Sequence, residues 1–96
     1  MTKCRVLVVD DNNTSRTLAA YYLEQFGCEV QWAASGEESL QDLLNEDFDL
    51  IVLDWRMPEM GGRETLILGD EILDRAKPKG QRLPVVIYTD SDLKLL

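Results

Sequence analysis

Three short segments of the chain are continuously apolar. They are residues 6–9 (Val-Leu-Val-Val), 50–53 (Leu-Ile-Val-Leu) and 85–88 (Val-Val-Ile-Tyr). Runs of this length without polar positions are typical of strands that are buried on both faces of a parallel sheet. Residues 29–33 alternate polar and apolar positions instead, which predicts a half-exposed strand.

A helical pattern follows the first of these strands. Asn12 or Asn13 can cap a helix that reaches about Phe26, and Gly27 can end it. Four apolar residues fall at helical spacing along this segment: Leu18, Tyr22, Leu23 and Phe26.

Two further helices are predicted. Ser35, followed three positions later by Glu38, forms a capping box for the second helix. Its buried stripe is expected to consist of leucines: Leu40, Leu43 and Leu44. A third helix covers about 63–76 and is weakened by Gly69 in its middle. Ser91 can cap a last short helix that the end of the chain cuts off.

The alternation β-α-β-α-β-α-β predicts an α/β fold with a doubly wound parallel sheet and helices on both faces. The 96 residues are enough for one domain and too few for two. Ligands of such sheets bind beyond the carboxyl ends of the strands. Functional residues are therefore expected there.

The composition of the chain narrows the classes of function that it can have. The chain has 18 acidic residues, 10 basic residues and no histidine, giving a net charge of −8. Such a chain is repelled by phosphate backbones, so it is not expected to bind nucleic acid directly. Its apolar runs are far shorter than the ~20 residues of a membrane span, and we expect a cytoplasmic protein. Cys4 and Cys28 fit neither a disulfide framework nor a zinc site, and each is expected to serve as a small apolar residue at the start of a strand.

Polar residues with oxygen side chains follow or end the three apolar strands. These residues are Asp10 and Asp11, Asp54, and Thr89. Two carboxylates ~4 Å apart repel each other by about 4 kcal/mol at an effective dielectric constant near 20. A hard divalent cation would remove this repulsion, and oxygen ligands suit Mg²⁺ or Mn²⁺. The sequence thus predicts a metal site formed by three aspartates.

The segments VLVVDDN, ASGEESL and DLIVLDWRMPEMGG resemble the receiver domains of two-component signalling, especially those of hybrid sensor kinases. The run D-x-x-M-P-x-M-x-G from Asp54 to Gly62 is the most specific part of the resemblance. The resemblance implies a flavodoxin-like (CheY-like) fold and one receiver domain over residues 1–96. It also implies that Asp54 accepts a phosphoryl group from a phosphohistidine of a histidine kinase or histidine phosphotransfer protein. The chain would then be no enzyme, because it modifies itself and is at most a weak autophosphatase.

The same resemblance assigns roles to individual residues. Asp11, Asp54 and the backbone carbonyl of Arg56 would bind Mg²⁺ directly, and Asp10 would act through a metal-bound water. Thr89 would be the switch hydroxyl that hydrogen-bonds the bound phosphoryl group. Independently of the resemblance, Trp55 and Arg56 are expected to form an exposed loop pair that either faces an incoming partner or is neutral, and Arg16 is expected to lie on a solvated helix face.

The chain also departs from the family pattern. It is expected to lack the fifth strand and fifth helix, with the lysine that ends that strand, so the domain would be incomplete at its C-terminus. Asp90 stands where the family usually has a small residue. One face of strands 6–9 and 50–53 would then be bare, and strand 85–88 would be an open edge. This predicts a homo-oligomer formed through the exposed sheet face or edge.

These departures leave an alternative function open. The chain could be a truncated pseudo-receiver that serves as a dimerisation or docking module without phosphoryl turnover. The absent lysine and Asp90 favour this alternative, whereas the intact aspartates and Thr89 favour phosphoryl acceptance. An independent metal-dependent phosphohydrolase is weakly supported, because the sequence shows no second general acid or base.

Overall fold

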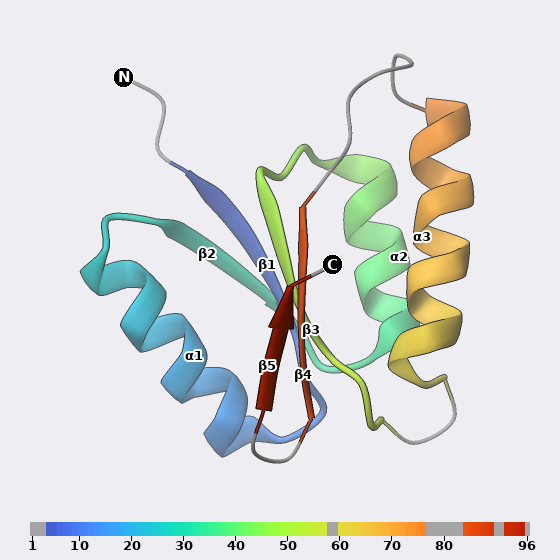
Figure 1. Cartoon of the computed structure of the whole chain (residues 1–96). Helices are drawn as coiled ribbons and strands as arrows, with labels where there is room; N and C mark the ends of the chain where they lie inside the picture. Colours follow the sequence, from blue (N-terminus) through green and yellow to red (C-terminus); the bar gives the residue numbers. More distant parts are fainter. Residues whose placement is uncertain (1–3, 58–59, 77–83, 90–91, 96) are drawn as a thin grey trace.

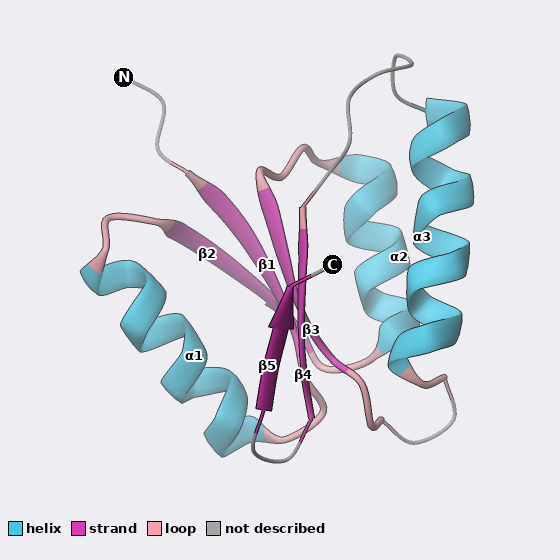
Figure 2. Ribbon diagram, in the orientation of Figure 1, coloured by secondary structure: helices cyan, strands magenta, loops and turns pink. Residues whose placement is uncertain are grey.

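Helices cover both faces of a single sheet in the computed structural model, which describes residues 4–57, 60–76, 84–89 and 92–95 (Figure 1). In chain order the elements are β1 (Arg5–Val9), α1 (Asn13–Gln25), β2 (Glu29–Ala33), α2 (Gly36–Asn45), β3 (Leu50–Asp54), α3 (Gly62–Ala76), β4 (Val85–Thr89) and β5 (Asp92–Leu95). Helix α1 lies on one face of the sheet, and α2 and α3 lie together on the other (Figure 2). Of the helices described, none is long and apolar enough to cross a membrane.

The sheet order is β2-β1-β3-β4-β5, and the first four strands are parallel. Four parallel strands with three helices confirm the predicted doubly wound, flavodoxin-like architecture. The predicted caps are confirmed as well. The side chain of Asn12 accepts a hydrogen bond from the Ser15 N–H (2.9 Å), and Ser35 Oγ accepts one from the Glu38 N–H (3.1 Å). Gly27 ends α1 with a φ of 86°, which favours glycine.

The prediction of a last short helix is wrong, because residues 92–95 form strand β5. This strand pairs antiparallel with β4, from Val86 opposite Leu95 to Thr89 opposite Asp92. The segment Asp-Leu-Lys-Leu alternates polar and apolar residues, as a strand does. Its backbone forms hydrogen bonds with the edge of β4 that would otherwise be unpaired. Strand β4 is therefore no open edge. No parallel fifth strand and no helix after α3 occur in the described part of the chain, and Ser91 lies outside it.

Alternation along the strands divides the core into two layers. The layer between the sheet and helices α2 and α3 consists of Leu7, Val9, Ala33, Leu43, Ile51, Leu53, Val85 and Ile87. The layer facing α1 consists of Val6, Val8 and Val52, with Ala19, Leu23, Cys28, Val30 and Leu50 packed against it. Because β1 and β3 contribute to both layers, they lie at the centre of the fold.

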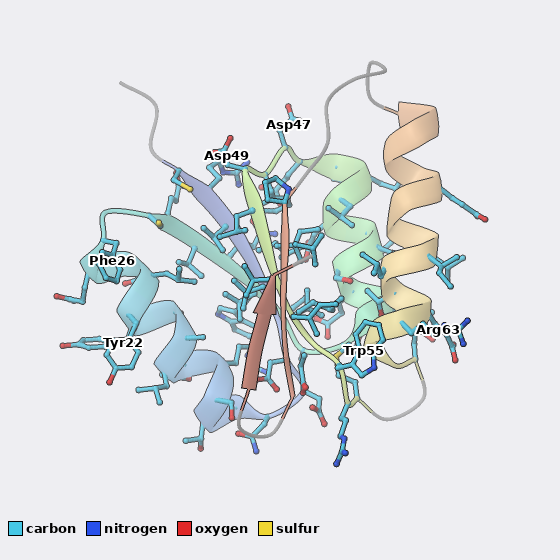
Figure 3. The ribbon with its side chains drawn as sticks, viewed as in Figure 1. Tyr22, Phe26, Asp47, Asp49, Trp55 and Arg63 are labelled. Carbon is cyan, nitrogen blue, oxygen red and sulfur yellow. The ribbon has the colours of Figure 1, made fainter. Side chains whose placement is uncertain are left out.

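The predicted bare face of β1 and β3 is not observed. Val6 and Val8 are 0% exposed and Val52 is 8% exposed. Large apolar side chains are exposed elsewhere on the molecule, among them Tyr22 of α1 and Phe26 just after it, which point away from the sheet (Figure 3). The helical pattern of α1 contains two adjacent stripes, and only the stripe with Leu23 meets the sheet. Leu44 of α2, predicted to be buried, is 51% exposed for the same reason.

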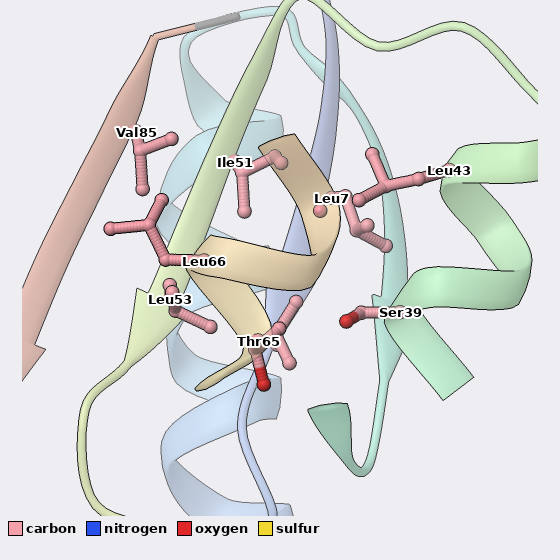
Figure 4. A pocket seen from close by; sticks show the side chains of 10 residues that line it. Leu7, Ser39, Leu43, Ile51, Leu53, Thr65, Leu66 and Val85 are labelled. Atoms are coloured by element: carbon pink, nitrogen blue, oxygen red, sulfur yellow. The ribbon is translucent and has the colours of Figure 1, made fainter. Parts of the chain in front are cut away.

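A small cavity of about 20 Å³ lies between the sheet and helices α2 and α3 (Figure 4). Most of its lining is aliphatic, and two hydroxyl residues, Ser39 and Thr65, also line it. Ser39 Oγ donates a hydrogen bond to the Gly36 carbonyl (2.6 Å), and Thr65 Oγ1 donates one to the Gly61 carbonyl (2.9 Å). Both hydroxyls are thus satisfied locally, and the cavity remains an apolar packing gap.

This gap predicts the effect of replacing Gly69 in α3. A Cβ at position 69 would lie 3.3 Å from Leu43 Cδ1, and Leu43 borders the cavity, so it has room to move aside. We expect Gly69→Ala to raise the unfolding free energy by ~0.5–1 kcal/mol through helix propensity. Urea unfolding measures this, and lower stability than wild type would contradict it. Gly62→Ala is the matched control and should destabilise, because its Cβ would meet backbone atoms at 2.7 Å that cannot move aside.

Candidate metal centre

The central strands β1 and β3 bring the predicted carboxylates together. Val9 pairs with Leu53, so Asp10 and Asp54, the next residues, reach the carboxyl edge of the sheet side by side. Oxygens of Asp10, Asp11 and Asp54 all lie within 4.8 Å of one another. The three aspartates that the sequence groups therefore converge in the structure. Asp10 is buried, Asp54 is half-buried and Asp11 is exposed.

Backbone groups hold Asp10 in place. Its Oδ1 accepts a hydrogen bond from the Asn12 N–H (2.9 Å), and its own N–H donates to the Ala33 carbonyl of β2 (3.1 Å). A buried carboxylate is stable only when such donors replace water. The cap of α1 and the end of β2 thus fix the innermost carboxylate.

Arg16 lies behind this site, and the prediction that it is solvated is wrong. It is 8% exposed, and its guanidinium donates to the Asp10 carbonyl (3.0 Å) and to Asn13 Oδ1 (2.9 Å). The guanidinium also lies 4.1 Å from the ring centroid of Trp32 in β2. The first turn of α1 directs this side chain back over the end of β1. Sequence spacing carried no signal for this, because the contact with Trp32 forms only when β2 pairs with β1.

Asp54 lies in an unusual electrostatic environment. Its Oδ1 accepts a hydrogen bond from the Arg56 N–H (3.1 Å), which favours the charged form. Burial and the neighbouring Asp10 and Asp11 outweigh this and raise the pKa of Asp54 to about 6. A divalent cation would offset this repulsion, and three carboxylate groups are the hard oxygen ligands that Mg²⁺ prefers. The residues present therefore fit such an ion.

The loop after Asp54 folds back against the start of α3. The Gly62 N–H donates to the Trp55 carbonyl (3.0 Å), and a Cβ on Gly62 would lie 2.7 Å from the Asp54 carbonyl oxygen. Close backbone approach thus explains the last glycine of the motif that begins at Asp54. Trp55 is half-buried and packs against the core layer between the sheet and helices α2 and α3. The prediction that both loop residues are exposed is therefore confirmed for Arg56 and wrong for Trp55.

The remaining predicted site residues are only partly described. Thr89 ends β4, one residue beyond Tyr88, which pairs with Asp54. Its backbone therefore lies at the same sheet edge as the aspartates. Pro58 and Asp90 lie outside the described residues.

Comparison with known proteins identifies a family. The response regulator receiver domain matches residues 6–94. The CAI-1 autoinducer sensor kinase/phosphatase CqsS of Vibrio cholerae is 36% identical over 88% of this chain, which corresponds to 12% of that protein. The alkaline phosphatase synthesis transcriptional regulatory protein PhoP of Bacillus subtilis is 45% identical over 92% of this chain and 34% of its own length. The chain thus spans a minor part of these relatives.

A solved structure agrees with this similarity. The receiver domain of the histidine kinase CKI1 from Arabidopsis thaliana, complexed with Mg²⁺ and BeF₃⁻, matches with a TM-score of 0.82. The match has 33% sequence identity and covers 93% of this chain and 67% of that one.

The raised pKa of Asp54 predicts how metal-free stability depends on pH. Because the folded state holds this proton more tightly than the unfolded state, Asp54 contributes more stability as pH falls from about 7 towards 4. Asp54→Asn, which mimics the neutral form, should therefore stabilise the protein at pH 7.5. This gain should shrink towards pH 4. Urea unfolding in EDTA at several pH values measures the difference.

Asp47→Asn is the control for the lost charge, because Asp47 is exposed and lies far from Trp55 in Figure 3. Its difference from wild type should not follow the pH profile of Asp54→Asn. A gain from Asp54→Asn that stays constant across this pH range would contradict the assignment of the raised pKa to Asp54.

Proposed function

Because the chain belongs to the response regulator receiver domain family, we propose that it accepts a phosphoryl group on Asp54 as one step of a two-component phosphorelay. The convergence of Asp10, Asp11 and Asp54 within 4.8 Å is the observation that carries this proposal. We further propose that residues 1–96 act as a single receiver domain in the cytoplasm.

The proposed donor is a phosphohistidine on a histidine kinase or histidine phosphotransfer protein. The sequence contains no histidine, so the donor imidazole lies outside these 96 residues. Similarity to CqsS, a sensor kinase/phosphatase, supports a donor of this class. We do not propose direct binding to nucleic acid, because a chain with a net charge of −8 is repelled by phosphate groups.

In the proposed reaction a carboxylate oxygen of Asp54 forms a bond to phosphorus while the bond from phosphorus to the donor nitrogen breaks. Asp11, Asp54 and the Arg56 carbonyl would bind Mg²⁺, or Mn²⁺, and Asp10 would hold a water on it. When bound, the cation neutralises charge on the phosphoryl oxygens. Thr89 would donate its hydroxyl to the phosphoryl group. In this proposal the chain modifies itself once and does not turn over a substrate. Its own removal of the phosphoryl group would be weak at most.

The contacts around Asp10 support its proposed role. The Asn12 N–H holds the Asp10 carboxylate and the Arg16 guanidinium holds its backbone carbonyl, and the carboxylate lies close to that of Asp54. A site that is organised before the cation arrives loses less entropy on binding it. The complex of the Arabidopsis receiver domain with Mg²⁺ and BeF₃⁻ supports the same choice of ion for this chain.

Fluorescence of Trp55, next to the acceptor, tests the proposal. In a Trp32→Phe background Trp55 is the single tryptophan, and Mg²⁺ should change its emission. Asp11→Asn should weaken Mg²⁺ binding by about tenfold or more. Asp47→Asn, which removes the same charge far from the site, should leave it within about twofold. BeF₃⁻ added with Mg²⁺ should then cause a second change, because it occupies the phosphoryl position.

The outcomes separate the candidate functions. Absence of any Mg²⁺ response in folded protein would contradict the proposed metal centre. A response to Mg²⁺ without a response to BeF₃⁻, together with no labelling by a phosphohistidine donor, would favour the docking module without phosphoryl turnover. Loss of both responses in Asp54→Asn, with the far-ultraviolet spectrum unchanged, is the result that phosphoryl acceptance requires.

We also propose that copies of the chain associate. The buried face of β1 and β3 gives no support for this, and the free sheet edges of the described strands are β2 and β5. The support lies instead on the outer face of α1, where Leu18, Tyr22 and Phe26 are 52%, 57% and 85% exposed. Light scattering should show a mass that rises with concentration in the micromolar range. Phe26→Ser should reduce this rise without destabilising the monomer, and a monomer at every concentration would contradict association.

A further inference from the structure

Cys4 and Cys28 lie side by side at the amino ends of β1 and β2. Arg5 pairs with Glu29 in the parallel ladder, so Cys4 and Cys28 occupy the preceding positions of the two strands. The Glu29 N–H donates to the Cys4 carbonyl at 2.8 Å, which continues the ladder to this pair. Neighbouring strands are ~4.8 Å apart, within the range of Cα separations that a disulfide spans.

The two thiols also point to the same face of the sheet. Cys28 packs against Val6 and Val8 in the layer that faces α1. Cys4 precedes Val6 by two residues, and side chains two apart in a strand share a face. Register and shared face therefore both favour a bond between the two sulfurs.

The two cysteines differ in accessibility. Both are free thiols; Cys4 is exposed and Cys28 is half-buried. An oxidant can therefore reach Cys4 first, with Cys28 positioned to react second. Partial desolvation, the neighbouring Cys28 thiol and the charge of Asp49 raise the pKa of the Cys4 thiol. Its thiolate is scarce near neutrality, so the reaction should be slow there and faster at higher pH.

We propose that Cys4 and Cys28 form a reversible disulfide within one chain when hydrogen peroxide is present. The sulfur of Cys4 attacks one peroxide oxygen, the O–O bond breaks, and Cys4 becomes a sulfenic acid while water leaves. The sulfur of Cys28 then attacks the sulfur of Cys4, the S–O bond of the sulfenic acid breaks, the S–S bond forms, and a second water leaves. Two thiols lose two electrons and two protons to one hydrogen peroxide.

The bond closes the unit β1–α1–β2 into a loop from residue 4 to residue 28. This loop contains Asp10 and Asp11, but the cysteines lie at the opposite sheet edge from these carboxylates. Oxidation should therefore stabilise the fold by restricting the unfolded chain and leave the metal centre almost unchanged. The inference is independent of phosphoryl acceptance, because it needs only the pairing of β1 with β2.

The experiment treats the reduced full chain with hydrogen peroxide at pH 8.5 under conditions that keep it monomeric. We expect both thiols to become unreactive to a thiol reagent, the intact mass to fall by about 2 Da, and dithiothreitol to reverse both changes. The midpoint of thermal unfolding should rise by roughly 10 °C. Magnesium affinity, measured by calorimetry, should change less than about twofold.

Single variants provide the controls. Cys28→Ser should leave Cys4 as a sulfenic acid or a disulfide between chains, with no rise in the unfolding midpoint, and Cys4→Ser should oxidise far more slowly. Two free thiols after prolonged treatment of the wild-type chain would overturn the proposal. Disulfides found only between chains would overturn it too. Neither result depends on whether a variant folds.

Discussion

Repulsion among three carboxylates at the carboxyl edge of the sheet is the constraint around which this structure is organised. The register of β1 on β3 brings Asp10 beside Asp54, and two buried core layers hold these strands in that register. Burial and this repulsion raise the pKa of Asp54, and the three carboxylates create a position for a cation. Folding energy from the apolar strands thus maintains a cluster of charge that would otherwise separate.

The sequence predicted the features that depend on local patterns. Continuous apolar runs identified the buried strands. The helix caps at Asn12 and Ser35 could be predicted because a residue with a side-chain oxygen precedes each helix. The convergence of the aspartates followed from parallel topology, which places successive strand ends at one edge. The roles of individual ligands and of Thr89 still rest on resemblance to the receiver family.

Features that depend on tertiary context could not be predicted. Arginine is usually exposed to solvent, yet the end of β1 and the ring of Trp32 bury Arg16. Leu18 and Leu23 both fit a helical stripe, and only the position of the sheet decides that Leu23 packs inward. The segment 92–95 is too short to choose between helix and strand by itself, and pairing with β4 decides the outcome.

The missing side chain at Gly62 has a mechanical consequence. Helix α3 begins in direct contact with the backbone of Asp54 and Trp55, with no flexible side chain between them to absorb a displacement. Its 15 residues form a rod of roughly 22 Å. A shift of the backbone at Asp54 would therefore act directly on the start of α3, and a rotation of the helix there would produce a larger movement at its far end.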